Sequence, residues 1–248
     1  MSLAEKGYEL HRKSDAEIRR YQIVGERCSG TNLLQVLCRR QFRTVGETNK
    51  FGWKHGFCQV NAACQSDFVI GVVRHPLTWV VSMYNRPWHT TSERQEMNFR
   101  EFISSPWQTH VDAIEYFDYP DKDALNTPLI QDRNPITGEM FSNIFELRNA
   151  KAWSLLGWQH RLENTAFVRM ETIVSGARDF FLEVAETFGV NEPDPNAKLK
   201  VKRRLGQKYR DDRSKISVSD LTADDITYIK SNLDPALEAR LGYDLNTF

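Results

Sequence analysis

Residues 25–32 read Gly-Glu-Arg-Cys-Ser-Gly-Thr-Asn, a glycine-containing turn between two regular elements. An apolar run typical of a strand, residues 21–24, precedes it, and a run typical of a helix, residues 33–38, follows it. A glycine-containing turn from a strand into a helix leaves backbone N–H groups unpaired, and the helix dipole adds partial positive charge there. The sequence therefore predicts a pocket for a phosphate-like anion.

The same stretch lacks the lysine of an ATP-type phosphate loop, which reads G-x-x-x-x-G-K-[ST]. The spacing from Gly25 to Gly30 fits that pattern, but Thr31 occupies the lysine position. No ammonium group reaches from this position toward a γ-phosphate. We therefore expect the loop to bind an anion shorter than a triphosphate.

Composition sets the class of protein. The chain has 248 residues, 40% of them hydrophobic and 27% charged, which is ordinary for a globular protein. Its 33 basic and 33 acidic residues balance, and this argues against broad nucleic-acid binding, which needs a basic face. We expect a single domain over residues 1–248, with an irregular insertion at about 85–143 that covers the acceptor site.

The cysteines and the N-terminal region indicate the compartment. Cys28, Cys38, Cys58 and Cys64 show no CxxC spacing, so neither a zinc pattern nor a disulfide framework is predicted. Residues 1–20 are polar and lack the apolar core of a signal peptide, and no run is long enough to span a membrane. The expectation is a cytoplasmic protein with reduced thiols.

Strand-like and helix-like runs alternate along the chain. We expect a polar helix over residues 4–20, helices near 93–104 and 144–158, an amphipathic helix through 180–188, a last helix over 222–233, and strands at 21–24, 44–46, 51–54, 68–73 and 165–169. This alternation predicts an α/β fold with a central, mostly parallel sheet and helices on both faces. Ligands of such sheets bind beyond the carboxyl ends of the strands. Residues 27–32 and 74–82 both follow strands, so we expect them to form one site.

Four segments then carry a family resemblance. Residues 27–32 resemble a loop for a 5′-phosphosulfate, and Arg74-His75-Pro76 followed by Ser82 resembles a 3′-phosphate motif. Residues 167–173 and the Leu-Gly-Tyr of 241–243 are similar to two further segments. Together they resemble the sulfotransferase superfamily that uses 3′-phosphoadenosine 5′-phosphosulfate (PAPS), in its bacterial form. The resemblance implies the P-loop-like sulfotransferase architecture.

The resemblance also implies an activity and a set of site residues. The enzyme would transfer a sulfuryl group from PAPS to a hydroxyl or amine of a small molecule, saccharide or lipid, releasing adenosine 3′,5′-bisphosphate (PAP) without a metal ion. Catalytic roles are implied for Arg27, Lys54 and His55. The donor-binding residues would be Arg27, Cys28, Ser29, Gly30, Thr31, Asn32, Arg74, Ser82, Arg203, Arg204 and Gly206.

The sequence departs from the family pattern at the loop. Many members have Lys or Arg two residues before the loop glycine, whereas this chain has Cys28 there. Either Arg27 supplies the missing cation from a shifted position, or Lys54 does. Residues 53–56, Trp-Lys-His-Gly, are a compressed form of the family's K-x-H segment, and residues 202–208 echo its late basic loop only faintly.

Several alternatives stay open at this stage. His75, His89 and His110 compete with His55 for the role of general base. Scattered aromatic residues either line an acceptor pocket or pack the insertion against the core: Trp88, Trp107, Tyr116 and Tyr119. The alternative functions are a P-loop kinase or nucleotidase, and a non-catalytic nucleotide-binding protein of the same fold.

Overall fold

The computed structural model describes residues 2–117, 122–190 and 214–248. The predicted donor-binding residues Arg203, Arg204 and Gly206 lie outside these ranges, and so does Tyr119. Within the described part of the chain, no helix combines the length and the apolar character that crossing a membrane requires.

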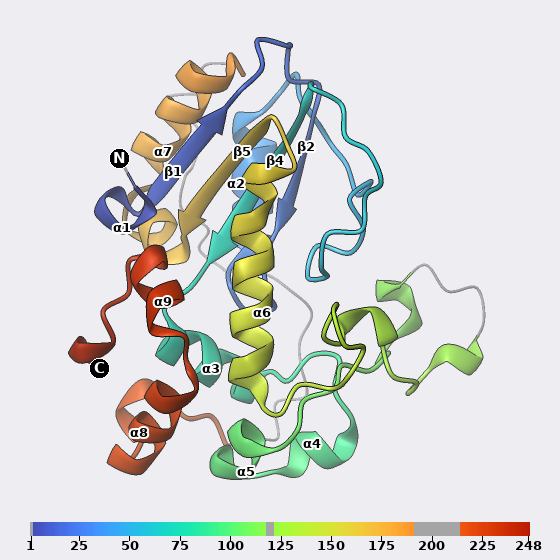
Figure 1. Cartoon of the computed structure of the whole chain (residues 1–248), viewed down its shortest axis with the longest axis vertical. Helices are drawn as coiled ribbons and strands as arrows, with labels where there is room; N and C mark the ends of the chain where they lie inside the picture. The colour runs from blue at the N-terminus through green and yellow to red at the C-terminus, as the bar shows by residue number, and fades with distance from the viewer. Residues whose placement is uncertain (1, 118–121, 191–213) are drawn as a thin grey trace.

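The fold is built on a five-stranded sheet with the order β1-β5-β4-β2-β3 (Figure 1). The strands are β1 (Tyr8–Arg12), β2 (Arg20–Val24), β3 (Gly46–Glu47), β4 (Asp67–Val73) and β5 (Asn164–Arg169). All neighbouring pairs are parallel except β1 and β5, which are antiparallel. The predicted α/β fold with a mostly parallel sheet is confirmed.

Strand β4 lies at the centre of the sheet, and every residue in it is buried. It pairs with β2 from Arg20 opposite Asp67, and with β5 from Phe68 opposite Asn164. A strand covered on both faces needs a continuous apolar run, which is the signal that predicted it. Gly71 is required here because a Cβ atom would lie 2.6 Å from the ring of Phe167.

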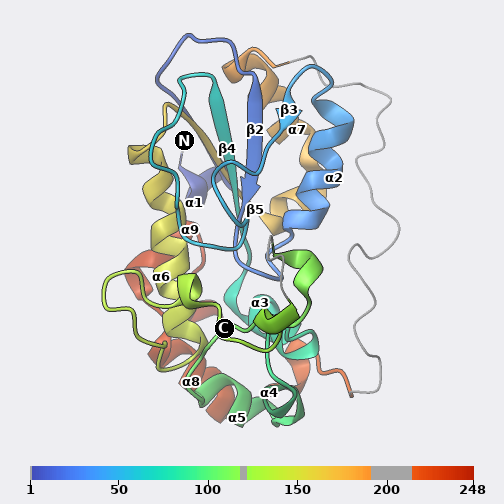
Figure 2. The same ribbon diagram turned by 90° about the vertical axis from the view of Figure 1, so that its right-hand side faces the viewer.

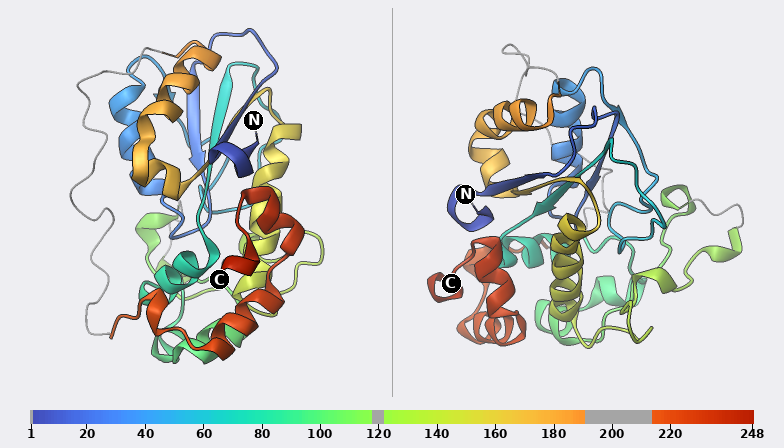
Figure 3. Two further views of the ribbon diagram at one scale, coloured as in Figure 1. Left: turned by 90° about the vertical axis from the view of Figure 1, so that its left-hand side faces the viewer. Right: turned by 45° about the horizontal axis from the view of Figure 1, so that its top comes forward.

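Helices cover both faces of the sheet, as the two views in Figure 3 show. Helices α2 (Thr31–Gln41) and α7 (Met170–Phe188) pack on one face, where Phe180 and Phe181 are fully buried. Helix α6 (Ile144–Leu156) packs on the other face, together with α9 (Pro235–Leu241). These two layers fix the direction in which the strands end.

A second layer of helices lies beyond the carboxyl ends of the strands (Figures 1 and 2). It contains α3 (Pro76–Asn85), α4 (Ser92–Glu96), α5 (Phe99–Ser104) and α8 (Ala223–Asn232). Its own apolar core includes Trp79, Phe102 and Phe145. The rest of the predicted insertion has single 3₁₀ turns at Ile114–Tyr116, Lys122–Ala124 and Ile130–Asp132; other 3₁₀ turns are Gly157–His160, Val218–Asp220 and Leu245–Thr247. This layer and the sheet edge above it enclose the candidate site.

The N-terminal prediction was wrong. Residues 4–20 do not form one polar helix, because the short helix α1 (Leu3–Lys6) ends at Gly7 and strand β1 follows. Tyr8 packs its ring edge-on against Phe180 of α7, with centroids 5.4 Å apart. This long-range packing on the edge of the sheet outweighs the polar composition of the segment.

Three smaller predictions also differ from the structure. Residues 51–54 form a turn instead of a strand, since Gly52 has a φ of 88°. The helix expected near 93–104 is divided into α4 and α5, because Asn98 caps the start of a new helix. Helix α9 was missed: Asp234 caps it, so the Asp-Pro pair that ends α8 also begins the next helix.

Candidate functional site

The loop between β2 and α2 is shaped by two glycines. A Cβ atom on Gly25 would lie 2.5 Å from the carbonyl oxygen of Val72, so only glycine allows this close approach to β4. Gly30, with a φ of 100°, turns the chain into α2, and Cys28 also has a positive φ, 63°. The positive φ angles fold residues 25–30 into a tight turn at the carboxyl end of β2.

The N-terminus of α2 offers backbone donors to an anion. Its N-cap residue, Gly30, has no side chain, no cap is found among the described residues, and the first turn contains no acidic residue. The first amides of a helix have no partner inside the helix, and the dipole gives them partial positive charge. Arg39 and Arg40 lie in the last turn, where they complement the other end of the dipole. The helix start is thus left open toward the solvent side of the loop.

The carbonyl groups of the loop are held by donors from other segments. His55 Nδ1 lies 2.6 Å from the Gly25 oxygen. Trp79 Nε1 donates to the Arg27 oxygen at 2.9 Å, and Arg74 Nη1 donates to the Cys28 oxygen at 3.0 Å. These hydrogen bonds occupy oxygen atoms that would otherwise repel an anion. The loop therefore presents donors to the site, and its acceptors are engaged elsewhere.

One open cavity of about 1170 Å³ brings most of the predicted site residues together. It is lined by Arg27, Cys28, Gly30, Thr31, Asn32, Lys54, His55, Arg74 and Ser82. Ser29 is the exception among the described candidates. Its side chain is buried, and it lines a much smaller cavity on the far side of the loop, beside Glu26 and Lys151.

Arg27 is buried in an ion-pair network. Its Nε donates to Glu26 Oε1 at 2.8 Å and its Nη2 donates to Asp132 Oδ2 at 3.3 Å. Burial alone would lower the pKa of Arg27, but the carboxylates of Glu26 and Asp132 raise it. Lys151 and Thr109 also donate to Asp132. Since two carboxylates balance its charge, Arg27 fastens the loop to the insertion, and its predicted contact with the donor remains a prediction.

Lys54 is the cation beside the open helix start. Its Nζ donates to Asn32 Oδ1 at 2.6 Å, and its backbone oxygen accepts from the Gly25 N–H at 2.9 Å. Burial lowers the pKa of Lys54. A partly desolvated ammonium group gains more from a neighbouring anion than a hydrated one does. Of the two cations that the sequence offered as substitutes at the Cys28 position, Lys54 is the better placed.

Arg74 links the loop to the first turn of α3. Its Nε donates to Thr78 Oγ1 at 3.0 Å while Nη1 contacts the loop at Cys28. Ser82 lies two turns into α3 and lines the same cavity. The Cys28 thiol contacts the Ser82 oxygen at 3.6 Å, and burial raises the pKa of Cys28, so the thiol stays neutral. Cys28 therefore brings no negative charge into the site.

The His55 ring is neutral and its tautomer is fixed. Burial, reinforced by the charge of Lys54, holds the pKa of His55 well below its ordinary value. Because a carbonyl oxygen can only accept, the contact with Gly25 places the proton on Nδ1 and leaves the lone pair on Nε2. The role of His55 as a general base remains a prediction.

Of the three histidines that the sequence offered beside His55, one lies in the cavity. His89 lines the cavity, and its Nδ1 lies 2.7 Å from Asp112 Oδ1. His75 and His110 do not line it. The cavity wall around His89 is aromatic: Trp53, Trp88, Tyr116 and Phe117. The insertion contributes Trp88, Tyr116 and Phe117, but no local pattern pairs residues 89 and 112, so only the tertiary structure reveals the pair.

Comparison of this chain with protein-family models, with curated proteins and with solved structures found no match.

Proposed function

We propose that this protein transfers a sulfuryl group from PAPS to an acceptor. The observation that carries the proposal is that the open N-terminus of α2 and the guanidinium of Arg74 line one cavity, joined through the Cys28 carbonyl. A nucleotide with single anionic groups on two ribose carbons needs two separate sets of donors. The loop and Arg74 supply two such sets at the carboxyl edge of one sheet.

The loop residues suit the 5′ end of the donor. The amides of Thr31 and Asn32, at the first positions of α2, provide fixed donors for a phosphate or sulfate oxygen. Lys54, hydrogen-bonded to Asn32, adds a positively charged ammonium group next to these amides. Thr31 stands where ATP-type loops have lysine, which favours the shorter anion.

Arg74 and Ser82 suit the 3′-phosphate. A guanidinium stays charged and can bind two oxygens of one phosphate. Arg74 Nε and Nη1 already position the side chain against Thr78 and the loop, so its approach to a ligand is preorganised. Ser82 lines the cavity from the following helix.

The chemistry requires stabilisation of the leaving oxygen. As the acceptor attacks sulfur, negative charge grows on the oxygen that bridges sulfur and the 5′-phosphate. Lys54 and the first amides of α2 would donate to this oxygen, and one fixed donor of this kind lowers a barrier by roughly 3 kcal/mol. His55 would keep the loop in position through its bond to Gly25.

Calorimetry with nucleotides tests the donor class. We expect PAP to bind at least about tenfold more tightly than AMP, because only PAP has a 3′-phosphate for Arg74; this is about 1.4 kcal/mol. ATP with Mg²⁺ should bind more weakly than PAP. A preference for ATP with Mg²⁺ would instead support the kinase reading. PAP binding without turnover of PAPS would support a non-catalytic binding protein.

A further inference from the structure

We infer that His89, oriented by Asp112, accepts the proton of the attacking acceptor, and that this acceptor is a hydroxyl group on a ring that packs against the surrounding aromatic side chains. The inference rests on the proposed sulfuryl transfer. It assigns a catalytic residue, a positioning residue and a substrate class to the half of the cavity that the donor would leave open.

Asp112 holds His89 at two points. One carboxylate oxygen lies 2.7 Å from Nδ1 of the ring, and the other accepts from the backbone N–H of the same residue at 2.7 Å. His89 has a φ of 59°, an uncommon conformation for a residue with a side chain. Because the carboxylate accepts the Nδ1 proton, the neutral ring keeps its lone pair on Nε2. This is the arrangement of a base oriented by a third group.

His89 lies next to the predicted sulfuryl site. Arg27 Nη1, from the loop, donates to the backbone oxygen of Trp88 at 3.3 Å, which holds the preceding residue against the loop. The Trp53 ring packs edge-on against both pocket histidines, with its centroid 5.3 Å from His55 and 5.3 Å from His89. His89 therefore lies across Trp53 from the loop and lines the same cavity.

The surroundings of the two histidines favour His89 as the base. A base that accepts a proton becomes a cation, so a neighbouring carboxylate stabilises the product and a neighbouring cation destabilises it. Asp112 faces His89, whereas Lys54 lowers the pKa of His55 and only a backbone carbonyl accepts from its ring. His55 is thus suited to hold the loop, and His89 to accept a proton.

The aromatic wall indicates the kind of acceptor. Ring centroids of Trp53, Tyr116 and Phe117 lie 5.3 Å, 5.7 Å and 5.0 Å from that of His89. Flat apolar faces of this kind pack against a ring-shaped ligand. A hydroxyl group becomes a strong nucleophile when a base accepts its proton, whereas a neutral amine attacks through its own lone pair before it loses a proton. The shared chemistry is a ring hydroxyl, of either a phenol or a sugar.

The proposed step transfers one sulfuryl group and one proton. The acceptor oxygen forms a bond to sulfur while the bond from sulfur to the bridging oxygen of PAPS breaks. The hydroxyl proton passes to His89 Nε2, and PAP leaves with the electron pair of the broken bond. Asp112 keeps its charge and stabilises the imidazolium.

The groups that face His89 set its pH dependence. Asp112 contacts the His89 ring and Tyr116 packs edge-on against it. A positive charge on His89 would add to the burial that lowers the pKa of His55. Arg27 contacts the neighbouring Trp88 carbonyl. Asp112→Asn removes the negative charge that stabilises the protonated ring, so the rate profile of this variant should differ from that of the wild type at acid pH.

The test measures turnover of PAPS with 2-naphthol, 2-naphthylamine and methyl glucoside, and PAP affinity by calorimetry. The variants are His89→Gln and Asp112→Asn, with His110→Gln as the control because His110 is an insertion histidine outside the cavity lining. We expect His89→Gln to reduce kcat with a hydroxyl acceptor by at least about 100-fold. Its PAP affinity should stay within about twofold, and His110→Gln should behave as wild type.

For Asp112→Asn we expect a lower kcat and a changed rate profile at acid pH, a change that a purely structural role would not produce. If His89→Gln does not fold, this pH profile decides the assignment. An unchanged kcat in His89→Gln, or a loss of PAP affinity equal to the loss of rate, overturns the inference. Faster turnover of 2-naphthylamine than of 2-naphthol overturns the acceptor class.

The two proposals fail differently. Without PAP binding by the wild type, the proposed function fails and the inference with it. With PAP binding but no turnover of either hydroxyl probe, the inference fails and the donor site stands. Between the hydroxyl probes, faster 2-naphthol turnover indicates a phenol and faster methyl glucoside turnover indicates a sugar.

Discussion

Two groups of helices begin in different ways, and the difference separates the binding edge of the sheet from the rest of the molecule. Among the described residues, the side chain of the N-cap residue caps six helices: α1, α4, α5, α6, α8 and α9. The helices that directly follow the parallel strands β2, β4 and β5 have no side-chain cap: α2, α3 and α7.

The three uncapped helices lack a stabilising interaction that the capped helices have. A capping side chain is worth about 1 kcal/mol, so an uncapped start leaves that free energy unused. At α2 the missing cap leaves backbone donors beside a cavity. An uncapped start in a helix that faces no cavity would only weaken the fold. Four predictions test this difference between the capped and the uncapped helices.

The largest effect is expected for Asn32→Asp, which puts a carboxylate in the open first turn of α2. It adds negative charge beside the bound anion and pairs with Lys54, which now contacts Asn32. PAP affinity should fall about 100-fold, or about 2.7 kcal/mol. Stability should rise by about 0.3–1 kcal/mol, because an acid suits a helix N-terminus. Calorimetry and thermal unfolding measure the two changes.

The matched control is the reverse exchange, Asp224→Asn, in the first turn of the capped helix α8. It should lower stability slightly and leave PAP affinity unchanged. Tight PAP binding by Asn32→Asp would show that α2 is open for a reason other than an anion.

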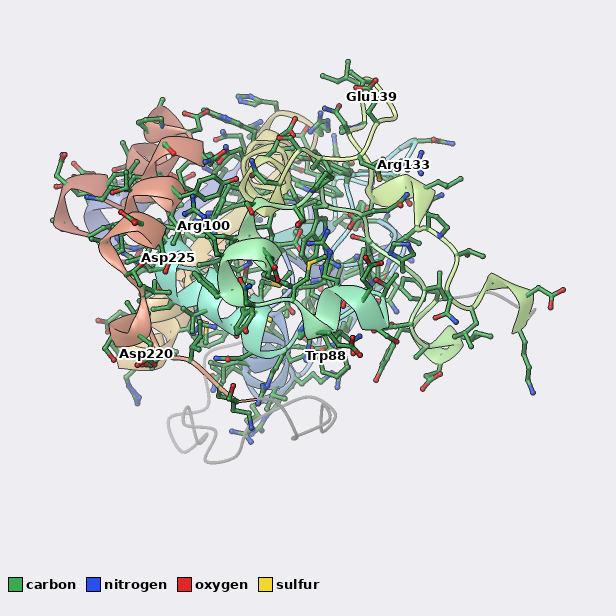
Figure 4. All side chains as sticks on the ribbon, turned by 90° about the horizontal axis from the view of Figure 1, so that it is seen from below. Trp88, Arg100, Arg133, Glu139, Asp220 and Asp225 are labelled. Atoms are coloured by element: carbon green, nitrogen blue, oxygen red, sulfur yellow. The ribbon has the colours of Figure 1, made fainter. Side chains whose placement is uncertain are left out.

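The second effect concerns Arg74→Ala, which removes the donor to the Cys28 carbonyl and the proposed contact to the 3′-phosphate. PAP affinity should fall at least tenfold, about 1.4 kcal/mol. Affinity for AMP should change less. Arg100→Ala is the control: Arg100 is half exposed and lies near Asp225, away from the cavity (Figure 4). Equal losses for PAP and AMP would remove the 3′-phosphate from the proposal.

The third prediction concerns a capped helix. Thr222 accepts from the Asp225 N–H and forms a capping box with it. Thr222→Ala should lower the free energy of unfolding by about 1 kcal/mol. PAP affinity of the folded protein should not change, as denaturant titration and calorimetry can show. A drop in affinity would mean that α8 is coupled to the site and that the contrast is too simple.

The smallest effect is a pH dependence at Lys54. Burial lowers its pKa, so the folded protein binds fewer protons than the unfolded chain at alkaline pH, and stability from this group rises with pH there. Lys54→Met should therefore be more stable than wild type near neutral pH, by less than about 1 kcal/mol. The difference should shrink as pH approaches the ordinary lysine value. Urea unfolding across pH measures it, and a constant difference would contradict it.

Sequence patterns predicted the elements whose signal is local. The continuous apolar run of 68–73 identified β4, and the phenylalanines of α7 identified its buried face. Strand β1 was missed because its pairing with β5 joins residues more than 150 positions apart in the chain (Tyr8 opposite Val168). Its local composition is polar, and only the edge of an existing sheet makes it a strand.

The grouping of the loop residues with Arg74 and Ser82 was predicted for the same reason. Glycine spacing and an Arg-x-Pro step are local patterns, and the cavity brings the residues 27, 28, 30–32, 74 and 82 together. The sequence left Trp88, His89 and Tyr116 among the open alternatives, and all three line the cavity, but the contacts that hold this part of the site were not predictable. Asp112 orients His89 across a loop, and Asp132 holds Arg27 from still farther along the chain. Such pairs depend on how the irregular insertion folds back onto the sheet edge.

The four cysteines differ in exposure, and this has a practical consequence. Cys64 is exposed and precedes β4 at the amino edge of the sheet, while Cys38 is buried and Cys58 is half-buried. Thiol reagents need an accessible sulfur atom, so exposure directs them to Cys64. A fluorophore attached to Cys64 would sit at the opposite end of the strand from Arg74. It could report unfolding with and without a ligand, and it would leave the cavity open.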